Sequence, residues 1–245
     1  MSTLVWAHRG ASGYAPENSM EAFRLANEQG ADGIELDIHM TKDGHIVVAH
    51  DETIDRCSDG KGRIIDKTLD ELRKYDFSNN VSGYKNIRIP TLEEVLEYVA
   101  KTKLTVNIEI KSGIVLYEGI EQKAIDLVNS LALTNRVIFS SFNHYSLMQI
   151  KQIDSRFPIG LLYQEAMVDP HVYAAHLKAE AIHPFYITLM VPNTVEGCKA
   201  AGIDINAWTV DQNEHIAWMY RLGVNAIITN YPDIAIEIGK QIYNI

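Results

Sequence analysis

Residues 30–51, GADGIELDIHMTKDGHIVVAHD, decide how this chain folds. Apolar and polar residues alternate over 34–38, a period of two that is typical of a β-strand. The Asp-Gly pair at 43–44 is a turn signal, and a β-branched run follows it at 45–49. Together they predict a hairpin that returns the chain to the end of the strand.

Two carboxylates of this strand point the same way. Glu35 and Asp37 are two positions apart, so their side chains share one face of the strand. Neighbouring carboxylates repel, and inside a protein they need a cation or a shared proton to compensate them. The hairpin also delivers His50 and Asp51 to the same end. These residues predict a metal site; the alternative is a plain hairpin with solvated charges.

Further motifs surround this stretch and make the sequence recognisable. They are HRG at 8–10, PENS at 16–19, VVAHD at 47–51, NIEIK at 107–111, NAWT at 206–209 and TNYPD at 229–233. With GADGIELDIHMTKDG at 30–44, their order and spacing resemble the glycerophosphodiester phosphodiesterase family, in its bacterial, cytoplasmic type. The resemblance covers nearly the whole chain and implies a phosphoric diester hydrolase of lipid and glycerol metabolism.

Length and charge limit the class of protein. The chain has 245 residues, 47% of them hydrophobic, which suits one α/β barrel domain of roughly 200–250 residues. Its net charge is −10 and it has no run of Lys or Arg, which argues against nucleic acid or an anionic membrane as a partner. We expect a small-molecule substrate; the oligomeric state is left open.

The cysteines and the N-terminal sequence indicate the cellular compartment. Cys57 and Cys198 lie far apart, so a disulfide framework is not expected and a reducing cytoplasm is compatible. A strand-like run begins almost at Met1, with no secretory leader pattern and no apolar stretch of about 18 residues. We therefore predict a cytoplasmic protein without membrane insertion.

The chain alternates strand and helix patterns. Strand-like runs lie at 4–7, 34–38, 104–110, 136–139, 158–163, 179–184, 204–210 and 225–229. Helical patterns lie at 19–29, 91–101, 117–132, 143–154, 169–177, 193–201, 212–222 and 233–242. Eight such units predict a TIM-like (β/α)8 barrel with parallel strands.

One connection of the barrel is unusually long. Residues 51–90 are rich in charged and turn residues, and a segment of this length is expected to be functional or to carry structure of its own. We interpret it as a small insertion over the mouth of the single barrel domain, as the resemblance also implies. Thr91…Glu94 and Asp211…Glu214 fit the spacing of capping boxes, and Pro232 suits a first helical turn.

A barrel would bring the candidate residues to one edge, since catalytic groups gather at the carboxyl ends of the strands. His8, Glu35, Asp37, Glu109 and Lys111 all lie at predicted strand ends. Three carboxylates without a Cys or His cluster favour a hard divalent ion, Mg²⁺ or Ca²⁺. By resemblance, Glu35, Asp37 and Glu109 match the family's metal ligands; for Glu109 the alternative is a structural ion pair.

The resemblance assigns catalysis to His8 and His50. A phosphodiester needs one group to activate the attacking oxygen and another to protonate the departing alkoxide, and imidazoles titrate in the right range. Each histidine alone could be a core residue. The sequence does not distinguish the acid from the base, nor direct attack by water from a cyclic phosphate route.

Other residues have proposed roles at the substrate. Arg9 and Lys111 are the expected phosphate ligands, with ion pairing to the carboxylates as the alternative. By resemblance Trp208 forms an apolar wall for the glycerol moiety. Asn18 or Ser19 can instead cap the first helix. A histidine at 183 is a possible residue of the barrel mouth without an assigned role.

These expectations combine into metal-dependent hydrolysis of glycerophosphodiesters to sn-glycerol 3-phosphate and an alcohol. One alternative is a lysophospholipase D-like phosphodiesterase on the same barrel, which should need an exposed apolar lip; the sequence shows no clear one. The other is a non-catalytic module that binds glycerophosphodiesters, although every position of the motifs is filled in this chain.

Overall fold

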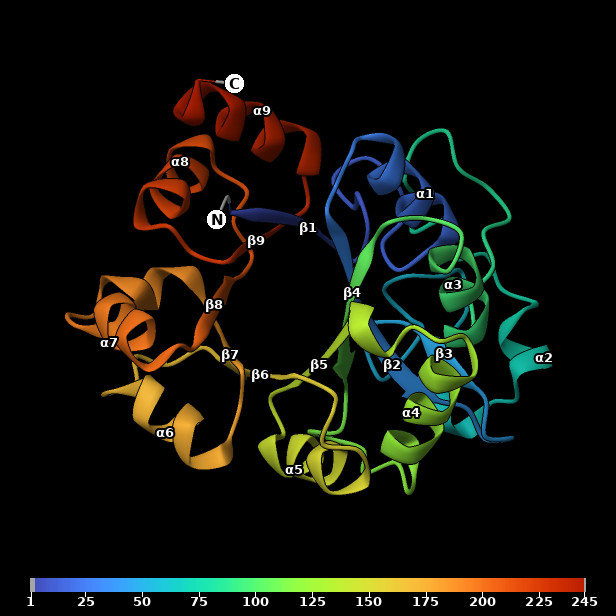
Figure 1. Cartoon of the computed structure of the whole chain (residues 1–245). Coiled ribbons are helices and arrows are strands. Elements are labelled where there is room, and N and C mark those ends of the chain that lie inside the picture. Colours follow the sequence, from blue (N-terminus) through green and yellow to red (C-terminus); the bar gives the residue numbers. More distant parts are fainter. Residues whose placement is uncertain (1–2, 245) are drawn as a thin grey trace.

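The computed structural model describes residues 3–244, and its centre is a closed barrel of parallel strands (Figure 1). The strands are β1 (Leu4–His8), β2 (Gly33–Met40), β4 (Thr105–Ile110), β5 (Val137–Ser141), β6 (Ile159–Tyr163), β7 (Ala181–Pro184), β8 (Asp204–Ala207) and β9 (Ala226–Thr229). Each pairs with the next, and β1 pairs with both β2 and β9, which closes the ring. The predicted TIM barrel is confirmed.

Helices surround the barrel on its outside (Figure 1). They are α1 (Met20–Glu28), α3 (Leu92–Val99), α4 (Ile120–Ser130), α5 (His144–Ile153), α6 (Pro170–Leu177), α7 (Thr194–Ala201), α8 (Asn213–Leu222) and α9 (Pro232–Tyr243). The apolar set of β2, from Ile34 to Ile38, is fully buried in one core with Phe23 of α1 and Leu96 of α3. The alternate residues of β2 are thereby left to face the barrel interior.

Three of the four predicted helix starts are present. The Ser19 hydroxyl accepts a hydrogen bond from the Ala22 N–H at the start of α1, and Thr91 and Glu94 form the reciprocal capping box of α3. Pro232 lies in the first turn of α9. The predicted cap by Asp211 is wrong, because α8 begins after Gln212 and has no side-chain cap.

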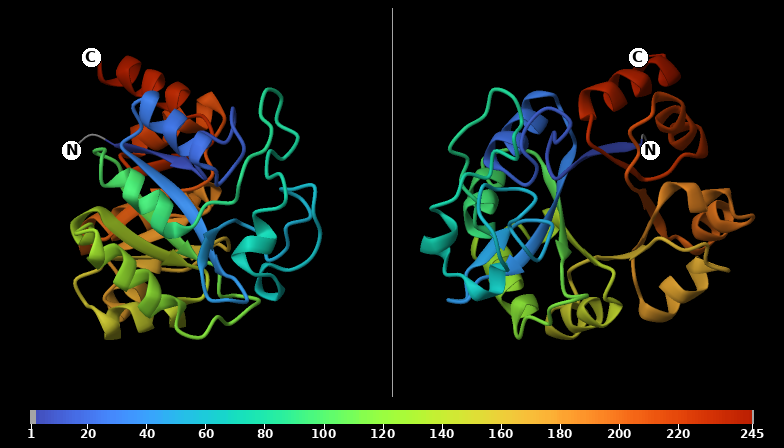
Figure 2. Two further views of the ribbon diagram at one scale, coloured as in Figure 1. Left: turned by 90° about the vertical axis from the view of Figure 1, so that its right-hand side faces the viewer. Right: turned by 180° about the vertical axis from the view of Figure 1, so that it is seen from behind.

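The predicted hairpin pairs β2 with β3 (Ile46–Val48) in antiparallel register. After it, residues 51–90 contain the short helices η1 (Ile64–Asp66) and α2 (Leu69–Leu72). Ile54, Leu72 and Phe77 of this segment form a separate small apolar core against Val47. Figure 2 (right) shows the segment over the part of the barrel mouth formed by the first strands, leaving β6–β8 uncovered.

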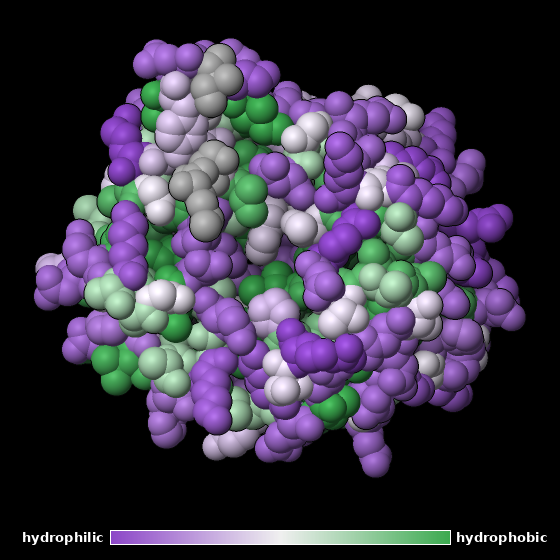
Figure 3. All heavy atoms as spheres, in the orientation of Figure 1, coloured by the Kyte–Doolittle hydropathy of each residue, from purple (hydrophilic) through white to green (hydrophobic). Residues whose placement is uncertain are grey.

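The opposite face of the barrel is the one on which β1 begins. Hydrophilic residues dominate that face in Figure 3, with apolar atoms showing between them. Two further short helices are η2 (Thr134–Arg136) and η3 (Tyr186–Met190). In the described part of the chain, neither cysteine is in a disulfide and no helix has the length and apolar character to cross a bilayer.

Candidate active site

Strand register brings three carboxylates together. In the pairing of β2 with β4, Asp37 lies opposite Glu109, and in the pairing of β1 with β2, His8 lies opposite Glu35. One carboxylate oxygen from each of Glu35, Asp37 and Glu109 lies within 4.8 Å of the other two. All three side chains are buried. The period of two along β2 and the register of its neighbour therefore build the cluster.

The three carboxylates carry more negative charge than their surroundings neutralise. Burial, together with the charges of Asp37 and Glu109, raises the pKa of Glu35 well above its ordinary value. Burial and Asp37 likewise raise the pKa of Glu109 to about 7. Burial opposes ionisation of Asp37 too, but Lys111 and Arg9 outweigh it and hold that pKa below its usual range. The cluster is suited to a cation.

Two basic side chains already contact the cluster. Lys111 Nζ lies 2.9 Å from Glu109 Oε1 and 3.7 Å from Asp37 Oδ1. The Arg9 backbone N–H donates to Glu35 Oε2 at 3.0 Å, and its guanidinium donates to Glu17 Oε1 at 2.9 Å. Arg9 has a left-handed backbone with φ of 57°, which turns the chain sharply after β1. Arg9 Nε also lies 3.5 Å from Asp37 Oδ2, so the ion pairs to the cluster that were predicted as alternatives are present for both residues.

His8 is held by a chain of hydrogen bonds from the last barrel strands. Its Nδ1–H donates to Asn230 Oδ1 at 2.7 Å, since an amide oxygen only accepts. The Asn230 side-chain NH₂ donates to Asp211 Oδ2 at 2.6 Å, and its backbone N–H donates to Asp211 Oδ1 at 2.9 Å. This network fixes the tautomer of His8, leaving Nε2 free 4.0 Å from Glu35 Oε2. Burial, followed by Arg9, lowers the pKa of His8 to about 4.

His50 is held by a carboxylate instead. Its Nδ1–H donates to Asp51 Oδ1 at 2.6 Å. Arg56 donates to Asp51 Oδ2 at 2.8 Å and also to both oxygens of Glu17, at 2.7 and 2.8 Å. Arg56 thus ties the 51–90 segment to the loop after β1. Both histidines keep Nε2 available for proton exchange.

The cavity at this edge has one polar and one apolar side. Its volume is about 50 Å³. The lining residues are His8, Arg9, Glu35, His50, Asn107, Glu109, Phe142, Leu162, Trp208 and Ile228. Trp208 packs edge-on against Phe142 with ring centroids 5.6 Å apart, and its indole N–H donates to the His183 carbonyl at 2.8 Å. Trp208 therefore belongs to the apolar side of the cavity.

A larger cavity, of about 910 Å³, lies at the opposite end of the barrel. It is remote from the carboxylates, and its two basic residues are engaged elsewhere: Lys199 donates to the Leu222 carbonyl and Arg136 to the Val99 carbonyl. We place the chemistry in the smaller cavity because the titratable groups converge there.

The structure places all eight candidate residues at this mouth: His8, Arg9, Glu35, Asp37, His50, Glu109, Lys111 and Trp208. Asn18, considered as a helix cap, instead donates to Asp37 Oδ2 at 2.9 Å. The suggestion that His183 is a mouth residue is wrong, because its side chain is fully buried inside the barrel. Sequence reasoning missed Asn230 and Asp211; the only signal for Asn230 was its place in the TNYPD motif.

The residues present fit a divalent cation. Asp37 Oδ1 is buried without a hydrogen-bond partner, so an oxygen of the cluster is free to ligate. The donors are all carboxylates, which suit a hard ion. Glu35, Asp37 and Glu109 are accordingly the residues that could hold one.

The barrel and this mouth define a class: a TIM-barrel enzyme whose acidic cluster and paired histidines suit chemistry on a phosphate ester. The model of the glycerophosphoryl diester phosphodiesterase family matches residues 8–234. The chain belongs to that family, and the resemblance predicted from the motifs is confirmed.

Individual relatives agree along the full length. A glycerophosphodiester phosphodiesterase of Caldanaerobacter subterraneus subsp. tengcongensis is 49% identical over 98% of this chain and 99% of its own. One from Bacillus altitudinis is 37% identical over 98% of this chain and 99% of its own. The crystal structure of an Oleispira antarctica phosphodiesterase in complex with the product sn-glycerol-3-phosphate is 29% identical, with a TM-score of 0.85 over 97% and 96% of the two chains.

Proposed function

We propose that this enzyme hydrolyses glycerophosphodiesters to sn-glycerol 3-phosphate and an alcohol, with a divalent cation and two histidines. The observation that carries the proposal is the convergence of His8, His50, Glu35 and Glu109 on one small cavity at the carboxyl ends of the first strands. The phosphodiesterase names of the similar proteins support the same reaction.

The cation would be Mg²⁺ or Ca²⁺, held by Glu35, Asp37 and Glu109. When bound, it would supply positive charge against the non-bridging oxygens of the phosphate. Lys111 and Arg9 add charge from the protein itself, and they orient the phosphate within the cavity. Both side chains pair with Asp37, and Arg9 also pairs with Glu17, which keeps them in place before substrate arrives.

The histidines would exchange the two protons of the reaction. Their hydrogen bonds through Nδ1 leave Nε2 of each available, so one can accept a proton from the attacking oxygen and the other can give one to the leaving alkoxide. Trp208 would contact the glycerol moiety on the apolar side. The 51–90 segment belongs in this proposal to the same domain, because Arg56 connects it to the site. The cytoplasmic location stays a prediction from the sequence.

The test is release of glycerol 3-phosphate from glycerophosphocholine and glycerophosphoethanolamine, with chelator, Mg²⁺ and Ca²⁺ as parallel conditions. We expect release with an ion and roughly 10²-fold less or none with chelator. His8→Ala and His50→Ala should each lose about 10²–10⁴-fold in kcat, whereas His176→Ala, on the exposed face of α6, should not. Full activity after exhaustive metal removal, or in the double histidine variant, would overturn the mechanism.

A non-catalytic role is the competing proposal. A module that only binds glycerophosphodiesters would show tight binding of glycerophosphocholine without turnover under every metal condition. The same assay, combined with calorimetric binding to the metal-loaded protein, separates the two.

A further inference from the structure

His39 is a buried imidazole to which the proposed mechanism gives no part. It continues the row of Glu35 and Asp37 on β2, because side chains two positions apart share one face of a strand. It is fully buried, and in the hairpin its register partner is Val47 of β3. A polar side chain in such a place needs partners for both ring nitrogens, and those partners indicate its role.

Both ring nitrogens of His39 are hydrogen-bonded. Nε2 lies 3.1 Å from the backbone carbonyl oxygen of His50, and Nδ1 lies 2.9 Å from the hydroxyl oxygen of Tyr117. Because a carbonyl oxygen only accepts, Nε2 carries the proton and donates to His50. Burial lowers the pKa of His39, so the ring is neutral near pH 7 and its Nδ1 accepts from the Tyr117 hydroxyl. The two partners thus fix the tautomer.

The bond from His39 restrains a backbone that is otherwise weakly held. His50 lies in a bend between β3 and the 51–90 segment. The hydrogen bonds of residues 3–244 include no other one to the backbone of His50 or Asp51. The residue before them, Ala49, is anchored by its N–H, which donates to the Asp37 carbonyl at 3.0 Å. The direction in which the chain leaves β3, and with it the His50 side chain, therefore depends on His39.

Tyr117 connects this restraint to the strand that carries another part of the site. It lies in the connection from β4 to α4 and is only 4% exposed. Its ring packs edge-on against His39, with ring centroids 5.6 Å apart. β4 itself carries Glu109 of the acidic cluster. His39 thus joins the chain after β3 to the chain after β4 through buried groups, and this sets the position of His50 relative to the cluster.

We propose that His39 is a positioning residue for His50: its Nε2–H holds the His50 carbonyl, so that the His50 imidazole is kept within reach of the phosphate ester. The inference rests on the proposed function, which gives His50 its part in proton exchange. Asp51 orients the ring through Nδ1, whereas His39 fixes the backbone from which the ring projects. A displacement of about 1 Å at a catalytic group can cost roughly 10²-fold in rate.

Two amide substitutions separate the two bonds of His39. The amide nitrogen of glutamine is as many bonds from Cα as the Nε2 of histidine, whereas the shorter asparagine reaches only as far as Nδ1. His39→Gln can therefore still donate to the His50 carbonyl, and His39→Asn can bond only Tyr117. With glycerophosphocholine we expect kcat to fall 10- to 100-fold in His39→Asn, with KM within about threefold. In His39→Gln, kcat should stay within about threefold of the wild type.

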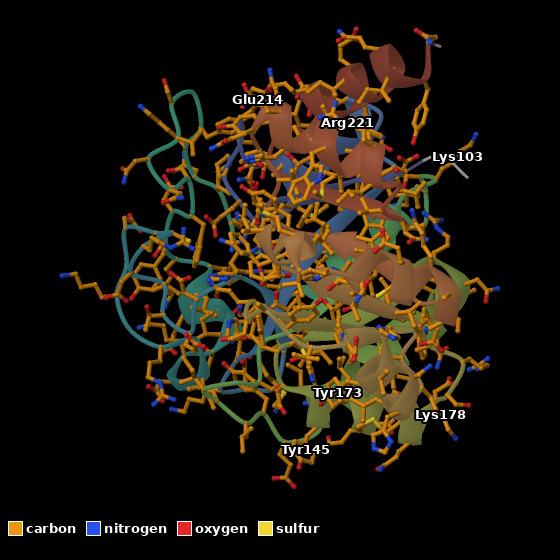
Figure 4. The ribbon with its side chains drawn as sticks, turned by 90° about the vertical axis from the view of Figure 1, so that its left-hand side faces the viewer. Lys103, Tyr145, Tyr173, Lys178, Glu214 and Arg221 are labelled. Atoms are coloured by element: carbon orange, nitrogen blue, oxygen red, sulfur yellow. The ribbon has the colours of Figure 1, made fainter. Side chains whose placement is uncertain are left out.

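His144 offers a matched control. Its Nε2–H donates to the Leu162 carbonyl at 2.9 Å, and its Nδ1 lies 3.1 Å from the Tyr173 hydroxyl, so it has the same two kinds of partner as His39. Tyr173 belongs to α6 (Figure 4), which lies on the opposite side of the barrel from β3 (Figure 1). Leu162 has no side-chain proton to exchange. His144→Asn should therefore keep kcat within about twofold.

A merely structural role predicts different results. His39 shares β2 with Asp37, so a disturbed strand would weaken cation binding as well as catalysis. Calorimetric titration with Mg²⁺ or Ca²⁺ should give the same stoichiometry for His39→Asn and the wild type, with Kd within about twofold. In a His50→Ala background, His39→Asn should cost less than about twofold in kcat, because no imidazole is left to position. If His39→Asn does not fold, His39→Leu, which makes neither bond and fills more of the space, should show the same fall.

Four results would overturn the inference. One is wild-type kcat in His39→Asn or His39→Leu. Equal losses in His39→Gln and His39→Asn would assign the effect to packing and not to the bond with His50. Weaker cation binding in His39→Asn, or a further loss in the His50→Ala background, would show that His39 acts through the carboxylates. A wild type that binds the cation but releases no glycerol 3-phosphate overturns the proposed function itself, and this inference falls with it.

Discussion

Glu35 is suited to binding a cation, but it lowers the stability of the folded protein when no cation is bound. Its pKa is raised by burial and by two neighbouring carboxylates, so without a cation its charge destabilises the folded protein. Glu35→Gln keeps an oxygen that can accept from the Arg9 N–H and removes the charge. We expect catalysis to fall by 10²-fold or more, while the chelated protein gains about 1 kcal/mol, which raises its Tm by roughly 2–4 °C.

Glu94→Gln is the matched control for that prediction. Glu94 is a carboxylate that serves the fold, since it completes the capping box of α3 and pairs with Arg73 at 2.6 Å. Its variant should keep activity and lose stability. Thermal melts in EDTA test the prediction. A Tm that falls for both Glu35→Gln and Glu94→Gln would contradict the view that the three carboxylates carry excess negative charge.

Asn230 is a positioning residue, because it holds His8 through Nδ1 and is itself held by Asp211. Asn230→Ala frees the imidazole to rotate and to change tautomer. We expect kcat to fall by roughly 10- to 100-fold with little change in KM. Asn225→Ala, which removes an amide that bonds Asp204 at the other end of the barrel, should leave kcat unchanged. A larger effect on KM than on kcat for Asn230→Ala would assign it to substrate binding instead.

At the scale of elements, the sequence predicted best what local periodicity encodes. The strand from Gly33 to Met40 alternates apolar and polar residues, and its period survives in the structure together with the carboxylates it carries. The prediction that failed concerned a side chain whose hydrogen-bond partners are distant in the sequence. Asp211 has the spacing of a helix N-cap, yet its carboxylate instead accepts hydrogen bonds from Asn230 and Thr229 at the end of β9.

The 51–90 segment is connected to the site by the side chain of Arg56, which we call the Arg56 clamp. Arg56 bonds Asp51, which holds His50, and also Glu17 of the loop after β1. Arg56→Met should therefore loosen His50 and lower kcat about tenfold. Its effect on stability should stay within about 1 kcal/mol, because the Arg56 side chain is 45% exposed and surface pairs contribute little.

Arg156→Met controls for the loss of a surface ion pair. Arg156 pairs with Asp154 at 2.6 Å just after α5, away from both histidines. Its variant should keep kcat. Steady-state kinetics and urea melts on both variants test the clamp, and equal kcat values for Arg56→Met and the wild type would exclude it.

At the scale of the whole molecule, the barrel interior is more polar than the branched apolar filling usual for this fold. His183 lies inside it, fully buried, with Asn206 Nδ2 2.9 Å from its Nε2. Gly160 leaves it room, because a Cβ there would clash with the imidazole. Its ring also packs edge-on against Trp6. None of these neighbours is charged, so nothing nearby stabilises an imidazolium.

This buried histidine should make the barrel sensitive to acid. Burial lowers the pKa of His183 to about 3 from 6.5, so between those pH values the unfolded chain binds a proton that the folded chain does not. Stability from this group is complete above pH 6.5 and falls as the pH drops, by about 2 kcal/mol between pH 7 and pH 5. His183→Gln, which can still bond Asn206, should be less stable at pH 7 but lose less on acidification. The test is the urea midpoint of unfolding measured from pH 7 to pH 5, with the exposed His176→Gln as control. If the midpoints of wild type and His183→Gln fall in parallel with pH, the acid sensitivity arises elsewhere, in the carboxylates and histidines of the mouth.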